Sequence, residues 1–126
     1  MIAYLTHFGA AIAIMLVAGA AYMVVTPYRE IALIRAGNTA AAVAFGGTMI
    51  GLSVTLFSVL ANSAGLLDFV TWGAIALVVQ LATWAVLALI LRNLRQGITD
   101  NKLSYGVFVG TLSIAIGIVN AGAVTY

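Results

Sequence analysis

Long apolar runs alternate with short polar connections along the whole chain, and this pattern predicts four helices. Because about 20 helical residues at 1.5 Å each cross a hydrocarbon core of roughly 30 Å, each run is long enough to span a membrane. The connections are too short to hold a folded water-soluble domain, so we expect one integral membrane domain over residues 1–126. The four predicted spans are Leu5 to Val25, Ala40 to Ala61, Val70 to Leu91 and Leu103 to Val124.

The first connection predicts a short surface helix from Pro27 to about Ala36. Thr26 precedes Pro27 as an N-cap residue precedes a proline at the first helical position. Gly37 is the type of residue that ends a helix, because it adopts a left-handed backbone at little cost. The expected helix is either a solvated helix whose arginines lie near lipid headgroups or a docking element for a cytoplasmic partner.

Two asparagines precede spans in equivalent places. Asn38 stands before the second span and Asn101 before the fourth, so each is expected to cap its own span through its side-chain oxygen. The alternative is a ligand site at the cytoplasmic rim, formed where the two caps approach each other.

The basic residues fall in two of the three connections. The second connection, Asn62 to Phe69, contains only Asp68 as a charged residue. Because cytoplasmic loops carry the excess of Lys and Arg, we expect the first and third connections in the cytoplasm. Both termini and the second connection are then on the non-cytoplasmic side. The basic residues are Arg29 and Arg35 in the first connection, and Arg92, Arg95 and Lys102 in the third.

A shift of 63 residues aligns the chain with itself at eight positions. We interpret this as a duplication with repeat units of about 1–63 and 64–126, each a helical hairpin, arranged in parallel about an axis along the membrane normal. The alternative is chance similarity between apolar helices. The matches are Ala11/Ala74, Ile12/Ile75, Ala13/Ala76, Arg29/Arg92, Asn38/Asn101, Phe45/Phe108, Gly47/Gly110 and Thr48/Thr111.

Composition agrees with a membrane chain, since 64% of residues are hydrophobic and 6% are charged, against roughly 25% charged in soluble domains. Residues 1–7 carry no Lys or Arg, so we expect a retained first span rather than a cleaved signal peptide. The chain has no cysteine, which excludes disulfides and thiol chemistry.

Small and polar residues recur at helical spacing on one face of the second span and one face of the fourth. In lipid such faces permit close helix packing, within one subunit or between subunits, and we expect a homo-oligomer. The predicted packing residues are Gly47, Gly51, Gly106, Gly110 and Gly117. The intramembrane polar residues are Thr55, Ser58, Asn62, Gln80, Thr83, Ser113 and Asn120.

These polar residues have two interpretations. Gln80, near the middle of the third span, is expected to hydrogen-bond between helices. The alternative is a narrow polar path through the membrane. That path would be lined by Thr55, Ser58, Asn62, Ser113 and Asn120.

Catalytic chemistry is poorly represented. The only carboxylates are Glu30, Asp68 and Asp100, and Asp68 is expected on the opposite side of the membrane from the other two. His7 is the only histidine, so no metal-ligand spacing exists. No charged residue lies at mid-membrane, which argues against a proton relay. We expect no enzyme, no cofactor, no metal and no nucleic-acid partner.

An ordered set of residues over nearly the whole chain resembles the YjfL-type small bacterial inner-membrane proteins, catalogued as domain of unknown function 350. The set is Glu30 ahead of Leu33-Ile34, Gly37-Asn38 with its alanine run, Gly51, Trp72-Gly73, Gln80, Asn101, Ser113, Gly117 and Asn120-Ala121. The resemblance implies a four-span protein of the bacterial inner membrane with two related halves and no assigned reaction. Some members are genetically associated with envelope-stress and membrane-remodelling proteins of the PspA type, which implies a cytoplasmic peripheral protein as partner.

Two functions therefore stay open. The first is a non-enzymatic, self-associating membrane scaffold that presents a cytoplasmic face to such a partner or to anionic membrane lipid. The second is an oligomeric channel or small transporter with Gln80 near its path. The expected cytoplasmic face consists of Arg29, Glu30, Arg35, Asn38, Arg92, Arg95, Asn101 and Lys102.

Overall fold

The computed structural model describes residues 1–26 and 28–124, and all regular structure within these residues is helical. Four helices are long and apolar enough to cross a membrane, which confirms an all-α fold of the polytopic membrane type. Each end of a predicted span lies within four residues of the observed end. The helices are α1 (Ile2–Val25), α2 (Glu30–Arg35), α3 (Thr39–Asn62), α4 (Leu66–Ile90), α5 (Leu94–Thr99) and α6 (Leu103–Ala123).

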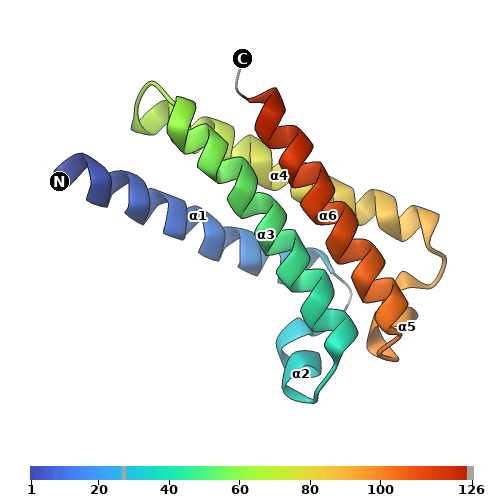
Figure 1. The fold of residues 1–126 in the computed structure, drawn as a ribbon. Helices are drawn as coiled ribbons and strands as arrows, with labels where there is room; N and C mark the ends of the chain where they lie inside the picture. The colour runs from blue at the N-terminus through green and yellow to red at the C-terminus, as the bar shows by residue number, and fades with distance from the viewer. Residues whose placement is uncertain (27, 125–126) are drawn as a thin grey trace.

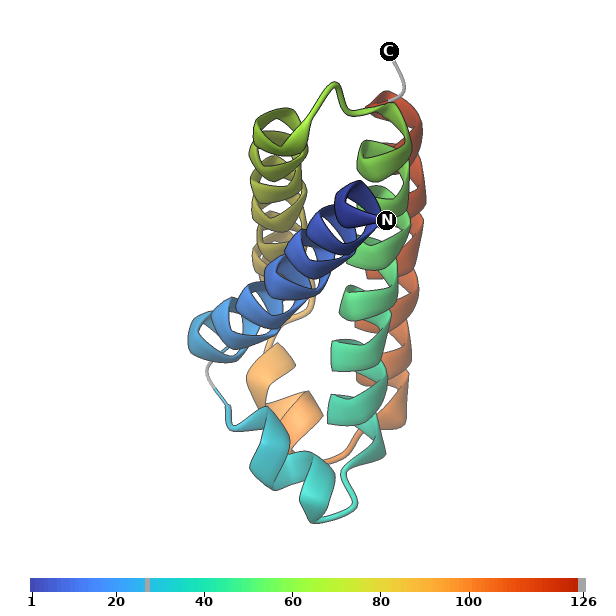
Figure 2. The same ribbon diagram turned by 90° about the vertical axis from the view of Figure 1, so that its left-hand side faces the viewer.

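The long helices form a bundle around one closely packed pair. Helices α3 and α6 run side by side in the same direction, with α4 packed along them (Figure 1). Helix α1 crosses the bundle obliquely and packs on α4 and α3 (Figure 2). The short helices α2 and α5 lie together at one end, away from the chain termini and from the loop between α3 and α4. The first and third connections are therefore on the same side of the bundle.

The α3–α6 pair is close because glycine faces glycine. A Cβ atom added to Gly47 would overlap the backbone of Gly110, and one added to Gly117 would overlap the backbone of Gly51. Near the start of the pair, Gly106 lies against the backbone of Ala40 in the same way. The five predicted packing glycines thus all lie at the contact between these two helices of one chain. The prediction of a homo-oligomer stays a prediction.

Both halves of the chain repeat the order of a long helix, a short helix and a long helix. Each short helix is followed by a residue with a left-handed backbone, Gly37 (φ 89°) after α2 and Asn101 (φ 57°) after α5. The amides of the next residues, Asn38 and Lys102, donate back into the last turn of the short helix. These equivalent turns are 64 residues apart, one more than the shift that aligns the two sequences. Duplication itself stays a prediction.

The first short helix begins later than predicted. Helix α2 begins at Glu30, with Arg29 as its N-cap and no side-chain capping bond, while the predicted role of Pro27 lies outside the described residues. Thr26 instead ends α1, because its backbone is extended and its hydroxyl donates to the Tyr22 carbonyl oxygen at 2.9 Å. Gly37 follows α2 as predicted.

Candidate functional site

The intramembrane hydroxyls on α3 are used for helix packing. The Thr55 hydroxyl donates to the Gly117 carbonyl oxygen at 2.8 Å, and the Ser58 hydroxyl donates to the Ala121 carbonyl oxygen at 2.7 Å. All of these groups are buried between α3 and α6. In the absence of water, such bonds satisfy polar groups that would otherwise be costly in lipid.

Gln80 joins α4 to the α3–α6 pair. Its side chain is only 2% exposed, and its Nε2 donates to the Ser113 carbonyl oxygen at 3.3 Å. A Cβ atom on Gly51 would overlap this Nε2, so the missing side chain of Gly51 makes room for the amide. The Gln80 Oε1 atom is buried and has no hydrogen-bond partner within the described part of the chain.

The other intramembrane polar residues do not converge on Gln80. Asn62 donates to the Ser58 carbonyl oxygen and Thr83 to that of Val79, each within its own helix. Asn120 is half-buried on α6. The structure therefore brings Thr55, Ser58, Ser113 and Gln80 to helix contacts and leaves the remaining three apart.

The two asparagines tie the short-helix ends of the two halves together. The Asn38 side chain accepts from the Ala41 amide at 2.8 Å, so it caps α3 as predicted, and its Nδ2 donates to the Ile98 carbonyl oxygen of α5 at 2.7 Å. The Asn101 side chain accepts from the Ala40 amide of α3 at 2.9 Å. Both caps therefore act on the same helix.

The expectation that Asn101 caps its own span is wrong. The N-cap of α6 is Lys102, which makes no side-chain capping bond. Asn101 lies one residue earlier, in the left-handed turn that corresponds to Gly37, and from there its side chain reaches across to α3. The two asparagines do approach each other, as the alternative of a ligand site expected. Their side-chain amides, however, hydrogen-bond to backbone groups of the protein.

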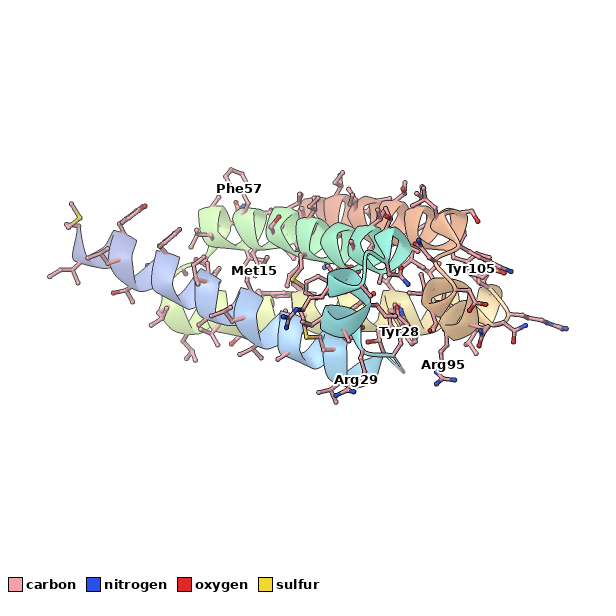
Figure 3. The ribbon with its side chains drawn as sticks, turned by 90° about the horizontal axis from the view of Figure 1, so that it is seen from below. Met15, Tyr28, Arg29, Phe57, Arg95 and Tyr105 are labelled. Atoms are coloured by element: carbon pink, nitrogen blue, oxygen red, sulfur yellow. The ribbon has the colours of Figure 1, made fainter. Side chains whose placement is uncertain are left out.

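The five basic side chains are exposed at the α2–α5 end. Arg29 and Arg95 extend from this end on either side of Tyr28 (Figure 3). Lys102 lies over the Tyr105 ring, 5.8 Å from its centroid. Of the predicted cytoplasmic face, Asn38 and Glu30 are buried, whereas Arg29, Arg35, Arg92, Arg95, Asn101 and Lys102 are exposed.

Glu30 points inward although it begins an exposed helix. It is 2% exposed, and its carboxyl group contacts the Thr26 hydroxyl. Burial raises the pKa of Glu30 to about 7, although the Thr26 hydrogen bond opposes this shift. The Thr26 hydroxyl has a single proton, which it donates to the Tyr22 carbonyl oxygen. Its bond to Glu30 is then satisfied if the Glu30 carboxyl is protonated and donates to the Thr26 oxygen.

Two grooves open at the same end. The first has a volume of about 460 Å³ and lies between the end of α1 and α2, where Met23, Arg29, Glu30, Ile31 and Arg35 line it. The second, of about 280 Å³, lies between α2 and α5 and is lined by Tyr28, Arg29 and Arg95 among others. Sequence reasoning missed both grooves, although the Arg pair beside apolar residues was visible in the first connection.

These features define a small polytopic membrane protein with a closely packed interior and one basic end. Among the described residues, no group of three His, Asp or Glu side chains is placed to hold a metal ion. The sequence profile of the family described as Domain of Unknown Function (DUF350) matches residues 1–124, and the chain belongs to this family.

Curated relatives agree with this assignment. The inner membrane protein YjfL of Escherichia coli strain K12 is 35% identical over 126 residues, which cover all of this chain and 96% of the relative. The protein of the same name from Escherichia coli O157:H7 matches equally well. No solved structure matches the chain significantly. The relatives and the four apolar helices support a multi-pass location in the inner membrane.

Proposed function

We propose that the protein is a non-enzymatic, self-associating scaffold of the inner membrane whose basic end recruits an acidic peripheral protein of the PspA type. The observation that carries this proposal is that α2 and α5 lie at the same end of the bundle, where all five basic side chains originate. The proposal includes a cytoplasmic location for this end and both termini on the opposite side.

The linked asparagines make this basic end a defined surface. Because Asn38 bonds to α5 and Asn101 bonds to α3, the two short helices are held relative to each other. Fixed positions reduce the conformational entropy that a partner must remove on binding. The nearby anionic leaflet also attracts basic side chains, at about 1 kcal/mol for each one near the surface. The surface therefore suits an acidic protein that binds at the membrane surface.

A sharp test uses nanodiscs of zwitterionic lipid, so that lipid charge does not recruit the probe. Discs that hold the protein should bind a purified acidic PspA-type protein, and Arg29→Glu with Arg35→Glu should weaken binding about tenfold or more, since like-charge contacts cost several kcal/mol. The charge-retaining pair Arg29→Lys with Arg35→Lys is the matched control and should keep most of the binding. Equal binding to empty discs, or no effect of charge reversal, would refute the proposal.

The second candidate is an oligomeric channel or small transporter. It is favoured by one observation, the buried Gln80 Oε1 atom that lacks a partner in the described residues. The packed hydroxyls of Thr55 and Ser58 favour the scaffold. Liposomes that contain the purified protein separate the two functions, because only a channel conducts ions and only there does Gln80→Leu change the conductance.

A further inference from the structure

The groove between α1 and α2 adjoins a second groove in the membrane-spanning part of the molecule, and we call the two together the combined groove. Met23 lines both, and the second is an apolar groove of about 510 Å³ between α1 and α3. The apolar groove runs along Met15, Gly19, Phe45 and Met49. A surface with arginines at one end thus passes directly into a purely apolar surface at the other.

The apolar groove exists because small residues face it and because α1 crosses α3 at an angle. Gly19 has no side chain, and a Cβ atom built there would lie 3.6 Å from the Phe45 ring, in ordinary contact. Ala20, which also lines the groove, is exposed. Figure 3 shows Met15 between α1 and α3 and Arg29 beside α2. Met15 lines the apolar groove and Arg29 lines the charged one.

The charged end of the groove is cationic. Arg29 and Arg35 line it and are exposed, whereas the Glu30 carboxyl is turned inward onto Thr26. Because burial raises the pKa of Glu30 to about 7, this carboxyl carries only part of its negative charge near neutral pH. An anion in the groove therefore meets two full positive charges and a weakened negative one.

We propose that the combined groove binds one anionic phospholipid, with its phosphate between Arg29 and Arg35 and an acyl chain along Met15, Phe45 and Met49. Arginine suits this role because its planar guanidinium donates two parallel hydrogen bonds to phosphate oxygens. Methionine suits the other end because its flexible thioether adapts to a mobile chain. Met23 lies where the headgroup meets the chain, close to the end of the first span.

A neighbouring groove is apolar in the same way but has no arginine at either end. It has a volume of about 310 Å³, lies between α1 and α4, and is lined only by apolar residues, Ala13 and Ala74 among them. It offers nothing to a headgroup, so bulk lipid of any charge fills it equally. This makes it an internal reference for the proposed site.

The test is native mass spectrometry of the detergent-purified protein, titrated with dioleoylphosphatidylglycerol or with dioleoylphosphatidylcholine. We expect one phosphatidylglycerol retained per chain and much weaker retention of phosphatidylcholine. Arg29→Gln with Arg35→Gln should weaken phosphatidylglycerol binding about tenfold or more, because hydrogen bonds to charged groups are among the stronger ones in proteins. Arg92→Gln, at the same end but away from the groove, should leave it unchanged.

A second pair of variants tests the acyl-chain part. Ala20→Trp places a large ring in the groove from an exposed position, and it should reduce phosphatidylglycerol retention. Ala74→Trp fills the uncharged groove from α4 and should have no such effect. Because both alanines are exposed, neither substitution disturbs the packed interior.

Three results would overturn the lipid site. They are equal retention of the two lipids, no effect of the Arg29 and Arg35 variants, and full competition by inorganic phosphate, which would make it a site for a free anion. The site uses the same basic end as the proposed scaffold, but this test contains no protein partner. Loss of partner recruitment with retained lipid binding would refute the scaffold alone, and the reverse would refute the lipid site alone.

Discussion

Gly46 and Gly47 are neighbours in the sequence but have opposite surroundings. A Cβ atom on Gly47 would overlap the backbone of Gly110, whereas one on Gly46 would have nothing within 4 Å. Alanine is a better helix former than glycine by about 1 kcal/mol, so propensity alone would favour both substitutions. At Gly47 the steric overlap is with backbone, which cannot rotate away.

We therefore expect Gly47→Ala to lower the free energy of unfolding by roughly 1 to 3 kcal/mol, the usual cost of overpacking. Gly46→Ala is the matched control and should leave stability unchanged or raise it slightly. Thermal unfolding in detergent, followed by circular dichroism, measures both. Equal midpoints for the two variants would show that α3 and α6 do not pack through this face.

Glu30 makes stability depend on pH in a predictable direction. Because its pKa is raised from 4.5 to about 7 in the folded protein, the folded state holds this proton more tightly than the unfolded state does. The contribution of this proton to the free energy of unfolding is fully present below about pH 4.5 and is lost as the pH rises through about 7. At about 1.4 kcal/mol per pKa unit, the shift from 4.5 to about 7 corresponds to a loss of roughly 3 kcal/mol.

The check is the unfolding free energy of the wild type and of Glu30→Gln between pH 5 and pH 8, in detergent of constant ionic strength. Glutamine keeps the shape of the protonated acid but cannot ionise, so the fall in stability should disappear in this variant. A slope of the same size in Glu30→Gln would assign the dependence to another group.

At the scale of elements, α3 is stabilised at its start by both halves of the chain. Asn38 caps it from its own half, and Asn101 accepts the Ala40 amide from the other half. Loss of a capping side chain typically costs about 1 kcal/mol. The first turn of α3 should therefore be sensitive to a residue more than 60 positions away.

Asn101→Ala should lower the unfolding free energy by about 1 kcal/mol and speed hydrogen exchange at the Ala40 amide. Asn93→Ala is an informative control, because Asn93 also has a left-handed backbone (φ 61°) but makes no side-chain capping bond. Asn93→Ala also places alanine in a left-handed backbone, but it removes no capping hydrogen bond. Exchange at Ala40 that stays slow in Asn101→Ala would contradict the cap across the two halves.

Much of this arrangement could be predicted from sequence, because the membrane imposes length and polarity on each span. The glycine spacing on α3 and α6 likewise indicated a packing face, since only small side chains permit such contact in lipid. The partner of that face was not predictable, because a spacing pattern fits any complementary helix. Helix α5 was missed because short helices depend on tertiary packing, here the burial of Leu94 and Ile98.

The site was predicted less well than the fold. The basic residues were evident as charges, but the inward turn of Glu30 depends on where α1 ends, which the Thr26-Pro27 pattern did not indicate. The crossed cap of Asn101 depends on a one-residue difference between the sequence shift and the structural repeat of the turns. The grooves depend on the crossing angle of α1, which no local pattern encodes.

For the whole molecule, the basic end and the two termini should lie on opposite sides of the membrane. An alkaline phosphatase fused after residue 126 should be active, since this enzyme folds outside the cytoplasm, and a fusion in the connection between α2 and α3 should be inactive. A fluorescent protein that matures only in the cytoplasm should give the reverse result at the two positions. An active phosphatase at the α2–α3 connection would overturn the proposed orientation.

The pairing of α3 with α6 also sets the order in which the molecule can be completed. Chains are made from the N-terminus at about 5–20 residues per second, so the backbone that Gly47 needs at Gly110 is synthesised roughly 3 to 13 seconds later. Helix α4 lies between α3 and α6 in the sequence, so it is synthesised before the partner of this glycine face exists. Of these four spans α6 is synthesised last, so a nascent chain that contains α3 but not yet α6 carries the glycine face without the helix it packs on.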